Sequence, residues 1–201
     1  MRIPRIFTRQ ALKPESTVEL EPGPSQHLSR VLRIQEGSEL VLFDGRGGEY
    51  PSIISAVGKK QVTVSTGAHR QAERESPLWV HLGIAVSRGE RMDWVMQKAT
   101  ELGVARITPL FSERTEVKLK GERAEKKVAH WQQIAISACE QCGRNQIPEV
   151  TPLQTLQSWL AEVPADLKLV LPHRADMKGA TATPRSLALL VGPVVGLSDP
   201  E

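Results

Sequence analysis

The sequence contains few cysteines and no long apolar run, and each absence excludes a class of protein. Two cysteines in 201 residues argue against a disulfide framework and favour a reducing, cytoplasmic setting. The apolar runs are far shorter than the roughly 18 residues that indicate a membrane span. The first residues, Met-Arg-Ile-Pro-Arg-Ile, lack the apolar segment of a secretory signal. We therefore expect a cytoplasmic protein.

The sequence also lacks the motifs of several common enzyme classes. It has no Walker loop, no Gly-x-Gly-x-x-Gly loop and no His-Glu-x-x-His motif, and its five histidines are scattered. Cys139 and Cys142 form a Cys-x-x-Cys pair at the end of a predicted helix, where the helix dipole does not lower a thiol pKa. No second pair completes a zinc site. We therefore predict structural thiols and no metal, and find no support for a hydrolase or a nucleoside triphosphatase.

Arginines are concentrated near the N-terminus. The formal net charge is only +3, but a sequence pI of about 9.0 permits an anionic partner. Arginine suits phosphate because its planar guanidinium donates two parallel hydrogen bonds. The alternative for these arginines is a solvated surface without a ligand. The candidates for RNA phosphate contacts are Arg2, Arg5, Arg9, Arg30 and Arg33.

Residues 1–70 have the pattern of a compact β-barrel with one helix. Short apolar segments separated by turn residues predict strands at 38–43, 49–57 and 61–66. Ser25 is a plausible N-cap of a short helix. The helical spacing of Leu28, Val31 and Leu32 predicts that they form its buried side.

Residues 71–77 are polar, end in Pro77 and predict a linker. Strands and helices alternate beyond it, over 78–201. A strand at 78–86, a turn at 87–91, a helix ending at Gly103 and a strand at 106–111 form a βαβ unit. A long helix at 122–142, a helix at 153–161 and strands at 149–151, 167–171 and 187–191 complete an α/β domain. The helix that ends at Gly103 has a predicted apolar stripe, which consists of Met92, Val95, Met96, Ala99 and Leu102.

Five segments in the same order carry a resemblance to a known family. Residues 1–6, 27–33, 43–45, 97–103 and 138–144 are similar to the ribosomal RNA small subunit methyltransferase E family. The resemblance implies an α/β protein with an N-terminal PUA-like RNA-binding barrel and a SPOUT-type domain of the trefoil-knot superfamily. It further implies S-adenosylmethionine as methyl donor, N3 of a 16S rRNA uridine as acceptor, and a homodimer whose active site lies at the interface.

The methyl transfer implied by the resemblance requires that the methyl donor and the acceptor nitrogen N3 are in line. It also requires that uracil N3 loses its proton. A basic pocket would stabilise the resulting anion. Turns after parallel strands are where ligands bind in such domains, and Arg88 and Arg91 lie in one. The catalytic base is unknown, and the candidates for the basic pocket are Arg88, Arg91 and Arg144, with His173 and Arg174 as weaker ones. The family's donor loop aligns with Leu190, Gly192, Pro193 and Gly196.

The last residues depart from the family pattern. The family has Gly-Pro-Glu-Gly-Gly where this chain has Gly-Pro-Val-Val-Gly at 192–196, and valine does not adopt the positive φ that glycine allows. The segment 198–201 has the pattern of a capping box, whereas the family continues through a second donor loop and a final helix. We therefore expect an incomplete SPOUT domain. The alternatives are a catalytically incomplete RNA-binding fragment and a product that folds poorly because a sheet edge is uncovered.

Overall fold

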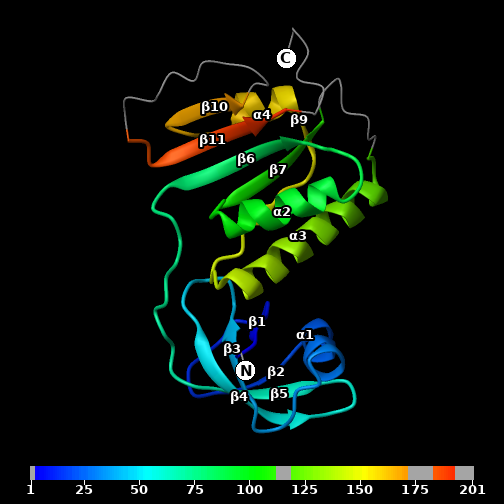
Figure 1. The fold of residues 1–201 in the computed structure, drawn as a ribbon, viewed down its shortest axis with the longest axis vertical. Helices are drawn as coiled ribbons and strands as arrows, with labels where there is room; N and C mark the ends of the chain where they lie inside the picture. The colour runs from blue at the N-terminus through cyan, green and yellow to red at the C-terminus, as the bar shows by residue number, and fades with distance from the viewer. Residues whose placement is uncertain (1–2, 112–118, 172–182, 193–201) are drawn as a thin grey trace. The chain divides into compact units, whose positions relative to one another are not determined.

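The computed structural model describes residues 3–111, 119–171 and 183–192. The chain forms two compact units (Figure 1). The first comprises Met1–Glu75 and Cys139–Ile147, and the second comprises Ser76–Ala138 and Pro148–Glu201. The sequence pattern predicts a first domain that ends at residue 70 and a second that begins at residue 78. It therefore does not assign 139–147 to the first unit. In the part of the chain that the structure describes, no helix is long and apolar enough to cross a membrane.

A five-stranded sheet forms the body of the first unit. Two of its strands were not predicted, because three residues are too few to show an alternating pattern. The pair formed by residues 5–7 and 41–43 is parallel and the other pairs are antiparallel. The strand order is β1 (Arg5–Phe7), β3 (Glu39–Phe43), β4 (Tyr50–Val57), β5 (Val62–Thr66) and β2 (Thr17–Glu19). Its inward apolar side chains, among them Leu40, Leu42, Ile54, Val62 and Val64, are almost fully buried.

The helical segment of the first unit differs from the prediction in two respects. Helix α1 (Pro22–Gln26) begins before Ser25 and continues as the π-helical turn η1 (His27–Val31). Ser25 is therefore not an N-cap: its buried hydroxyl donates to the Leu20 carbonyl and accepts from the Val62 amide.

Leu28 is buried as predicted, but Val31 and Leu32 are 67% and 43% exposed. The prediction that these two residues are buried is wrong. A π turn contains more residues than an α turn, so the helical spacing assumed from the sequence does not hold beyond Leu28.

The second unit contains a parallel sheet, as the α/β pattern predicts. Of the strands described in this unit, the sequence missed only the short β9 (Gln154–Thr155), which pairs with residues 110–111. The strand order is β10 (Leu167–Leu171), β11 (Ser186–Val191), β6 (Trp79–Ala85), β7 (Arg106–Phe111) and β8 (Glu149–Val150).

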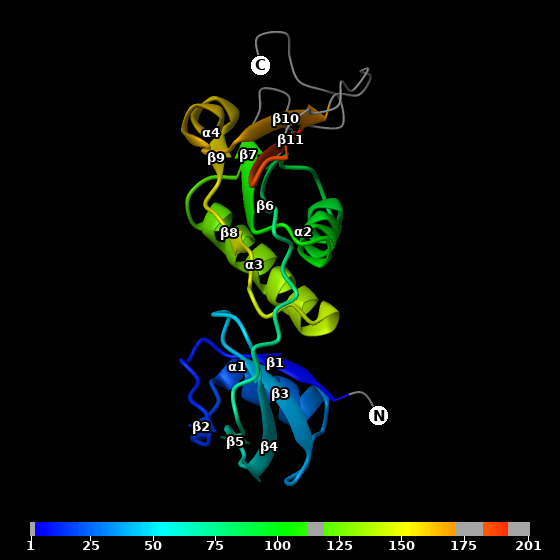
Figure 2. The ribbon, with the colours of Figure 1, turned by 90° about the vertical axis from the view of Figure 1, so that its left-hand side faces the viewer.

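Helices cover both faces of this parallel sheet. Helix α2 (Arg91–Glu101) lies on one face, together with the part of α3 (Glu122–Cys142) that belongs to the second unit. Helix α4 (Leu156–Glu162) lies on the opposite face (Figure 2). The bounds of α3 agree with the prediction, and Trp131 and Ala135 on it are buried.

Helix α2 ends at Glu101, and Gly103 two residues later has the predicted left-handed conformation, with a φ of 94°. The Val104 amide donates to the Ala99 carbonyl and the Gly103 amide donates to the Thr100 carbonyl, which is a Schellman motif. Met92, Met96 and Ala99 are buried, but Leu102 is 84% exposed. Its predicted burial is wrong because the helix stops at the C-cap, so the stripe does not extend one turn further.

A buried polar network joins the sheet of the second unit to α4. The Trp159 Nε1–H donates to His81 Nε2 at 3.2 Å, and Thr108 Oγ1 lies 2.8 Å from the same nitrogen. Because an indole N–H can only donate, His81 Nε2 must accept and the ring proton must lie on Nδ1. Burial, with a smaller effect of Arg106, lowers the pKa of His81 from 6.5 to about 4. The histidine is therefore neutral at physiological pH.

We expect the second unit to lose stability as the pH falls from about 6.5 to about 4. Within this window the unfolded chain binds a proton at His81, whereas the folded chain does not. The free energy of unfolding then falls by at most about 1.4 kcal/mol per pH unit for this one proton. Urea unfolding followed by tryptophan fluorescence across this pH range measures the slope. His81→Gln should flatten it, and an unchanged slope in that variant would assign the effect to other groups.

Candidate functional site

The order of the parallel strands reverses at β6 and β11, whose carboxyl ends lie side by side. These strands are neighbours, with Ile84 opposite Val191. From β6 the chain moves to β7 on one side, and it later reaches β11 through β10 on the other side. Ligands bind where strand order reverses in this way, outside the carboxyl ends of the strands. The turn that follows β6 starts at this position, and Gly192 directly follows the end of β11 there.

The turn between β6 and α2 presents two arginines. The Val86 amide donates to the Leu110 carbonyl at 3.0 Å, which fixes the start of the turn. Gly89 has a φ of 66°, a left-handed conformation that favours glycine. Arg88 and Arg91 follow the strand end and are exposed. The structure therefore places both predicted arginines at the carboxyl end of β6 in the second unit.

The predicted donor-binding residues are only partly described. Leu190 is 3% exposed, and its side chain packs in the core beneath α4, so it can offer only its backbone to a ligand. Gly192 follows the end of β11 directly. Pro193 and Gly196 lie outside the described residues, as do Arg2, His173 and Arg174.

Arg144, the third candidate for the basic pocket, lies in the first unit and has a structural role there. Its side chain is 6% exposed and forms an ion pair with Glu75, with Arg144 Nε 2.9 Å from Glu75 Oε1. Burial disfavours the charged guanidinium, but Glu75 outweighs this effect and raises the pKa of Arg144. Arg144 is thus not in the same unit as Arg88 and Arg91.

Arg5 is similarly occupied inside the first unit. Its guanidinium lies 2.6 Å from Glu49, donates to Asn145 and lies over the Phe43 ring. Burial alone would raise the pKa of Glu49, but Arg5 and Arg74 outweigh it and hold this pKa below its ordinary value. Arg5 therefore stabilises the unit in the structure, and we leave it out of the RNA contacts proposed below.

The other described arginines among the candidates for RNA binding are accessible. The side chains of Arg9, Arg30 and Arg33 are exposed, and among the described residues they form no ion pairs. Arg30 lies on η1, and Arg33 follows it with a φ of 49°. These three side chains are free to contact phosphate.

The sequence pattern did not reveal the role of the polar segment before Pro77. Arg74 donates to the Gly143 carbonyl at 2.8 Å, and Asn145 and Gln146 donate to Ala72 and Glu73. The mixed charges of residues 71–76 were the available signal that this segment makes specific contacts, because a flexible linker does not require alternating acids and bases. Residues 70–75 and 139–147 instead hold each other within the first unit.

The two cysteines are not bonded to each other. Burial raises the pKa of Cys139 to about 12, and its thiol lies 3.5 Å from the Gln146 carbonyl. Cys142 is exposed. Among the residues described, no group of three His, Cys, Asp or Glu side chains could hold a metal ion.

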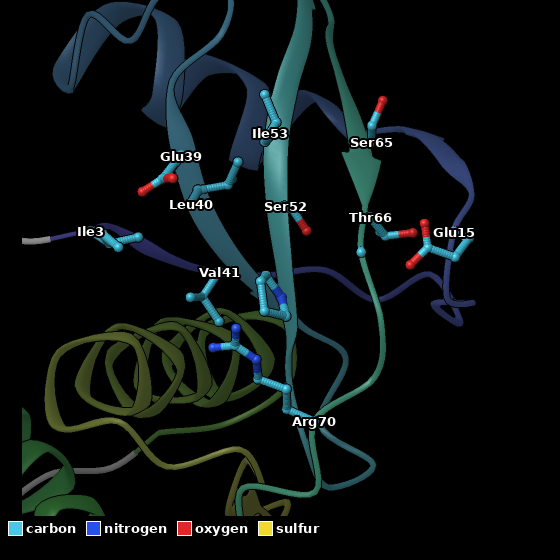
Figure 3. Close-up of a pocket in the computed structure, with 12 residues that line it drawn as sticks. Ile3, Glu15, Glu39, Leu40, Val41, Ser52, Ile53, Ser65, Thr66 and Arg70 are labelled. Atoms are coloured by element: carbon cyan, nitrogen blue, oxygen red, sulfur yellow. The ribbon is translucent and has the colours of Figure 1, made fainter.

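A groove of about 490 Å³ lies on the sheet of the first unit (Figure 3). Ile53 and Val41 contribute apolar surface, Glu39 and Glu15 lie on opposite sides, and Arg70 lies toward one end. Two carboxylates against one guanidinium make this groove a poorer phosphate site than the exposed arginines near η1.

Two family models match the chain in adjoining stretches. The RNA methyltransferase PUA domain matches residues 25–66, and the RNA methyltransferase domain matches residues 74–201. The five-stranded sheet and the parallel sheet thus belong to the two domains of an RNA methyltransferase.

The chain belongs to the ribosomal RNA small subunit methyltransferase E family, which confirms the resemblance and the expected fold class. A ribosomal RNA small subunit methyltransferase E from Neisseria gonorrhoeae, solved with bound S-adenosylmethionine, is 36% identical. It has a TM-score of 0.92 over 99% of this chain and 83% of that chain.

Two further relatives agree with this assignment. A methyltransferase from Legionella pneumophila, solved with the same cofactor, is 44% identical, with a TM-score of 0.94 over 100% of this chain and 84% of that chain. The ribosomal RNA small subunit methyltransferase E of Buchnera aphidicola subsp. Schizaphis graminum is 35% identical over 158 residues. This match covers 79% of the chain and 64% of that relative.

Proposed function

We propose that this chain transfers a methyl group from S-adenosylmethionine to N3 of a uridine in 16S ribosomal RNA. The observation that carries the proposal is the reversal of strand order at β6 and β11, in a fold that the chain shares with relatives solved with this donor bound. We further propose a homodimer, and a cytoplasmic location because ribosomal RNA is found there.

In this proposal, different residues of the second unit bind the donor and the acceptor at the carboxyl ends of β6 and β11. The backbone from Leu190 through Gly192 faces the donor side, where Pro193 and Gly196 continue the predicted donor loop. Arg88 and Arg91 at the end of β6 face the acceptor side. S-adenosylmethionine supplies an activated methyl group, so the protein needs to align the reactants and exclude water.

Arg88 and Arg91 serve the acceptor in this proposal. Uracil N3 loses its proton as the methyl group is transferred, and the negative charge spreads to the neighbouring carbonyl oxygens. A guanidinium close to those oxygens stabilises this charge in the transition state more than in the ground state, which is the requirement for catalysis. The base that takes the proton is not assigned.

Two measurements test this function. Calorimetric titration with S-adenosylmethionine should show saturable binding, and incubation with 16S rRNA or small subunits should place a methyl group at uracil N3. Methylation at N3 removes the pairing N–H, so a reverse-transcription stop locates it. RNA binding without donor binding would instead support the alternative of an RNA-binding chain without catalysis.

Arg30 and Arg33 provide a separate test of RNA binding by the first unit. Replacing both with alanine should weaken RNA binding and reduce the slope of log affinity against log salt by about 0.7–0.9 for each phosphate that the arginines neutralise. The melting temperature should stay nearly constant because both side chains are exposed. The control removes the same charge from the β4–β5 turn, with Lys59→Ala and Lys60→Ala. Equally weakened binding in both double variants would argue against a specific arginine contact.

A further inference from the structure

The segment that follows helix α1 exposes two aliphatic side chains between two arginines. Val31 is 67% exposed and Leu32 is 43% exposed, whereas Leu28 in the same π turn is fully buried. The side chains of Arg30 and Arg33, which flank the aliphatic pair in sequence, are exposed as well. Four consecutive residues therefore face solvent, and the middle two are apolar while the outer two are cationic.

Backbone hydrogen bonds and core packing hold this segment in place. The Leu32 amide donates to the His27 carbonyl at 3.0 Å, which closes the π turn η1. The Ile34 amide donates to the Leu28 carbonyl, also at 3.0 Å. Leu28 and Ile34 both pack with the core of the first unit. Residues 29–33 are thus anchored at both ends, and π turns of this kind are frequent at functional sites.

Arg33 has a backbone conformation that favours glycine. Its φ is 49°, and among the described residues other than glycine only Glu15 shares a positive φ. A Cβ makes this left-handed conformation costly, whereas glycine adopts it freely. An arginine where glycine fits better indicates that the guanidinium is required at this position.

The chemistry of this surface suits an unpaired nucleotide. Each of the two guanidiniums can bind a phosphate with parallel hydrogen bonds. The aliphatic pair between them offers the kind of apolar surface against which a base packs when it has left its stack. Residues 27–35 include no carboxylate that would oppose an anion.

We propose that Val31 and Leu32 pack against an unpaired base of the substrate RNA, while Arg30 and Arg33 bind the phosphates on either side of it. This inference rests on the RNA binding in the proposed function and adds a contact to a base. Phosphate contacts position a strand but carry no information about its bases. A base can reach the aliphatic pair only when it is unstacked, as in loops and bulges. The segment therefore selects single-stranded RNA.

The alternative occupant of this surface is a protein. A standard interface buries about 800 Å² on each partner, far more than two aliphatic side chains supply. Ile53, which is exposed in the groove of Figure 3, does not extend the surface. Its neighbour Ile54 belongs to the core cluster that contains Leu28, and successive side chains of a strand point to opposite faces of the sheet. The observations therefore favour RNA.

The test measures the affinity of the full chain for a short oligouridylate and for the same oligomer with abasic nucleotides, which keeps the phosphates and lacks the bases. Val31→Ala combined with Leu32→Ala should lower the affinity for the oligouridylate about 5- to 30-fold, the lower part of the range for one stacked base. The affinity for the abasic oligomer should stay the same. The matched control is Ile53→Ala with Val57→Ala, which removes two exposed aliphatic side chains from β4 and should change neither affinity.

Arg33→Gly tests the flanking phosphate contact separately. Glycine keeps the left-handed conformation at no steric cost, so the melting temperature should not fall. The affinities for both oligomers should fall in the same proportion, and the slope of log affinity against log salt should decrease by about 0.7, the value for one phosphate of a single strand. The aliphatic double variant should leave this slope unchanged, because it removes no charge.

Three results would overturn the inference. Equal effects of the aliphatic double variant on both oligomers, while the wild type still methylates its RNA, would reject the base contact and leave the proposed function intact. Weaker binding of that variant to small subunits, with unchanged affinity for the oligouridylate, would assign this surface to a ribosomal protein. A wild type that binds neither the oligouridylate nor 16S rRNA would reject the proposed function together with the inference.

Discussion

Replacing Arg144 with methionine is expected to lower the free energy of unfolding of the first unit by about 3–5 kcal/mol. Arg144 and Glu75 are 6% and 15% exposed at the side chain and form an ion pair. Removing one partner of a buried pair leaves the other charge desolvated and uncompensated, which is costly. Because all four tryptophans belong to the second unit, hydrogen exchange over residues 1–75 and 139–147 is the appropriate measurement.

Two comparisons make this result specific to a buried pair. Lys126→Met breaks a pair with Glu122 in which both side chains are more than 70% exposed, and it should cost less than about 1 kcal/mol. Arg144→Met combined with Glu75→Leu should be less destabilising than Arg144→Met alone, because no unpaired charge remains. Loss of methyl transfer by Arg144→Met with unchanged protection would instead give Arg144 the catalytic role predicted from the sequence.

Replacing Trp159 with alanine is expected to destabilise the second unit by about 3–5 kcal/mol. Trp159 is 3% exposed and packs with Leu110, Leu156 and Leu190. The substitution leaves a large cavity, and it removes the N–H that His81 accepts. Urea unfolding monitored by the fluorescence of the remaining tryptophans measures the loss.

Gly83 tests the same packing from the strand side. A Cβ at this position would lie 2.7 Å from the Trp159 ring, so Gly83→Ala should cost about 1–3 kcal/mol through overpacking. The control is Gly23→Ala, where no atom lies within 4 Å of the added Cβ. Trp94→Ala is the control for loss of a tryptophan, because an exposed ring leaves no cavity. A loss in Trp94→Ala equal to that in Trp159→Ala would contradict the packing account.

The long elements were predictable because their patterns are long and regular. The apolar positions of α3 repeat over 21 residues, and β6 and β11 are mostly apolar over seven and six residues. The three-residue strands β1 and β2 could not be found, because a strand of that length is defined by its partner. Val31 was misassigned because η1 changes the helical spacing.

The candidate site was likewise predictable from the sequence only in part. The turn with Arg88 and Arg91 could be located from the sequence, since a strand followed by a helix defines a turn at the strand's end. That β11 lies beside β6 could not be seen, because the strands are far apart in sequence and their pairing depends on the whole sheet. The pairing of Arg144 could not be seen for the same reason: its partner Glu75 is 69 residues away.

The sequence by itself determined the α/β class, the methyltransferase family and the turn that carries Arg88 and Arg91, because these depend on local patterns and ordered motifs. The tertiary structure decided which charges are available. It pairs Arg5 and Arg144 with carboxylates inside the first unit, and leaves Arg91 and Trp94 in solvent on the second. Charge and polarity are properties of a residue, but burial and pairing are properties of its neighbours, which come together only when distant segments pack.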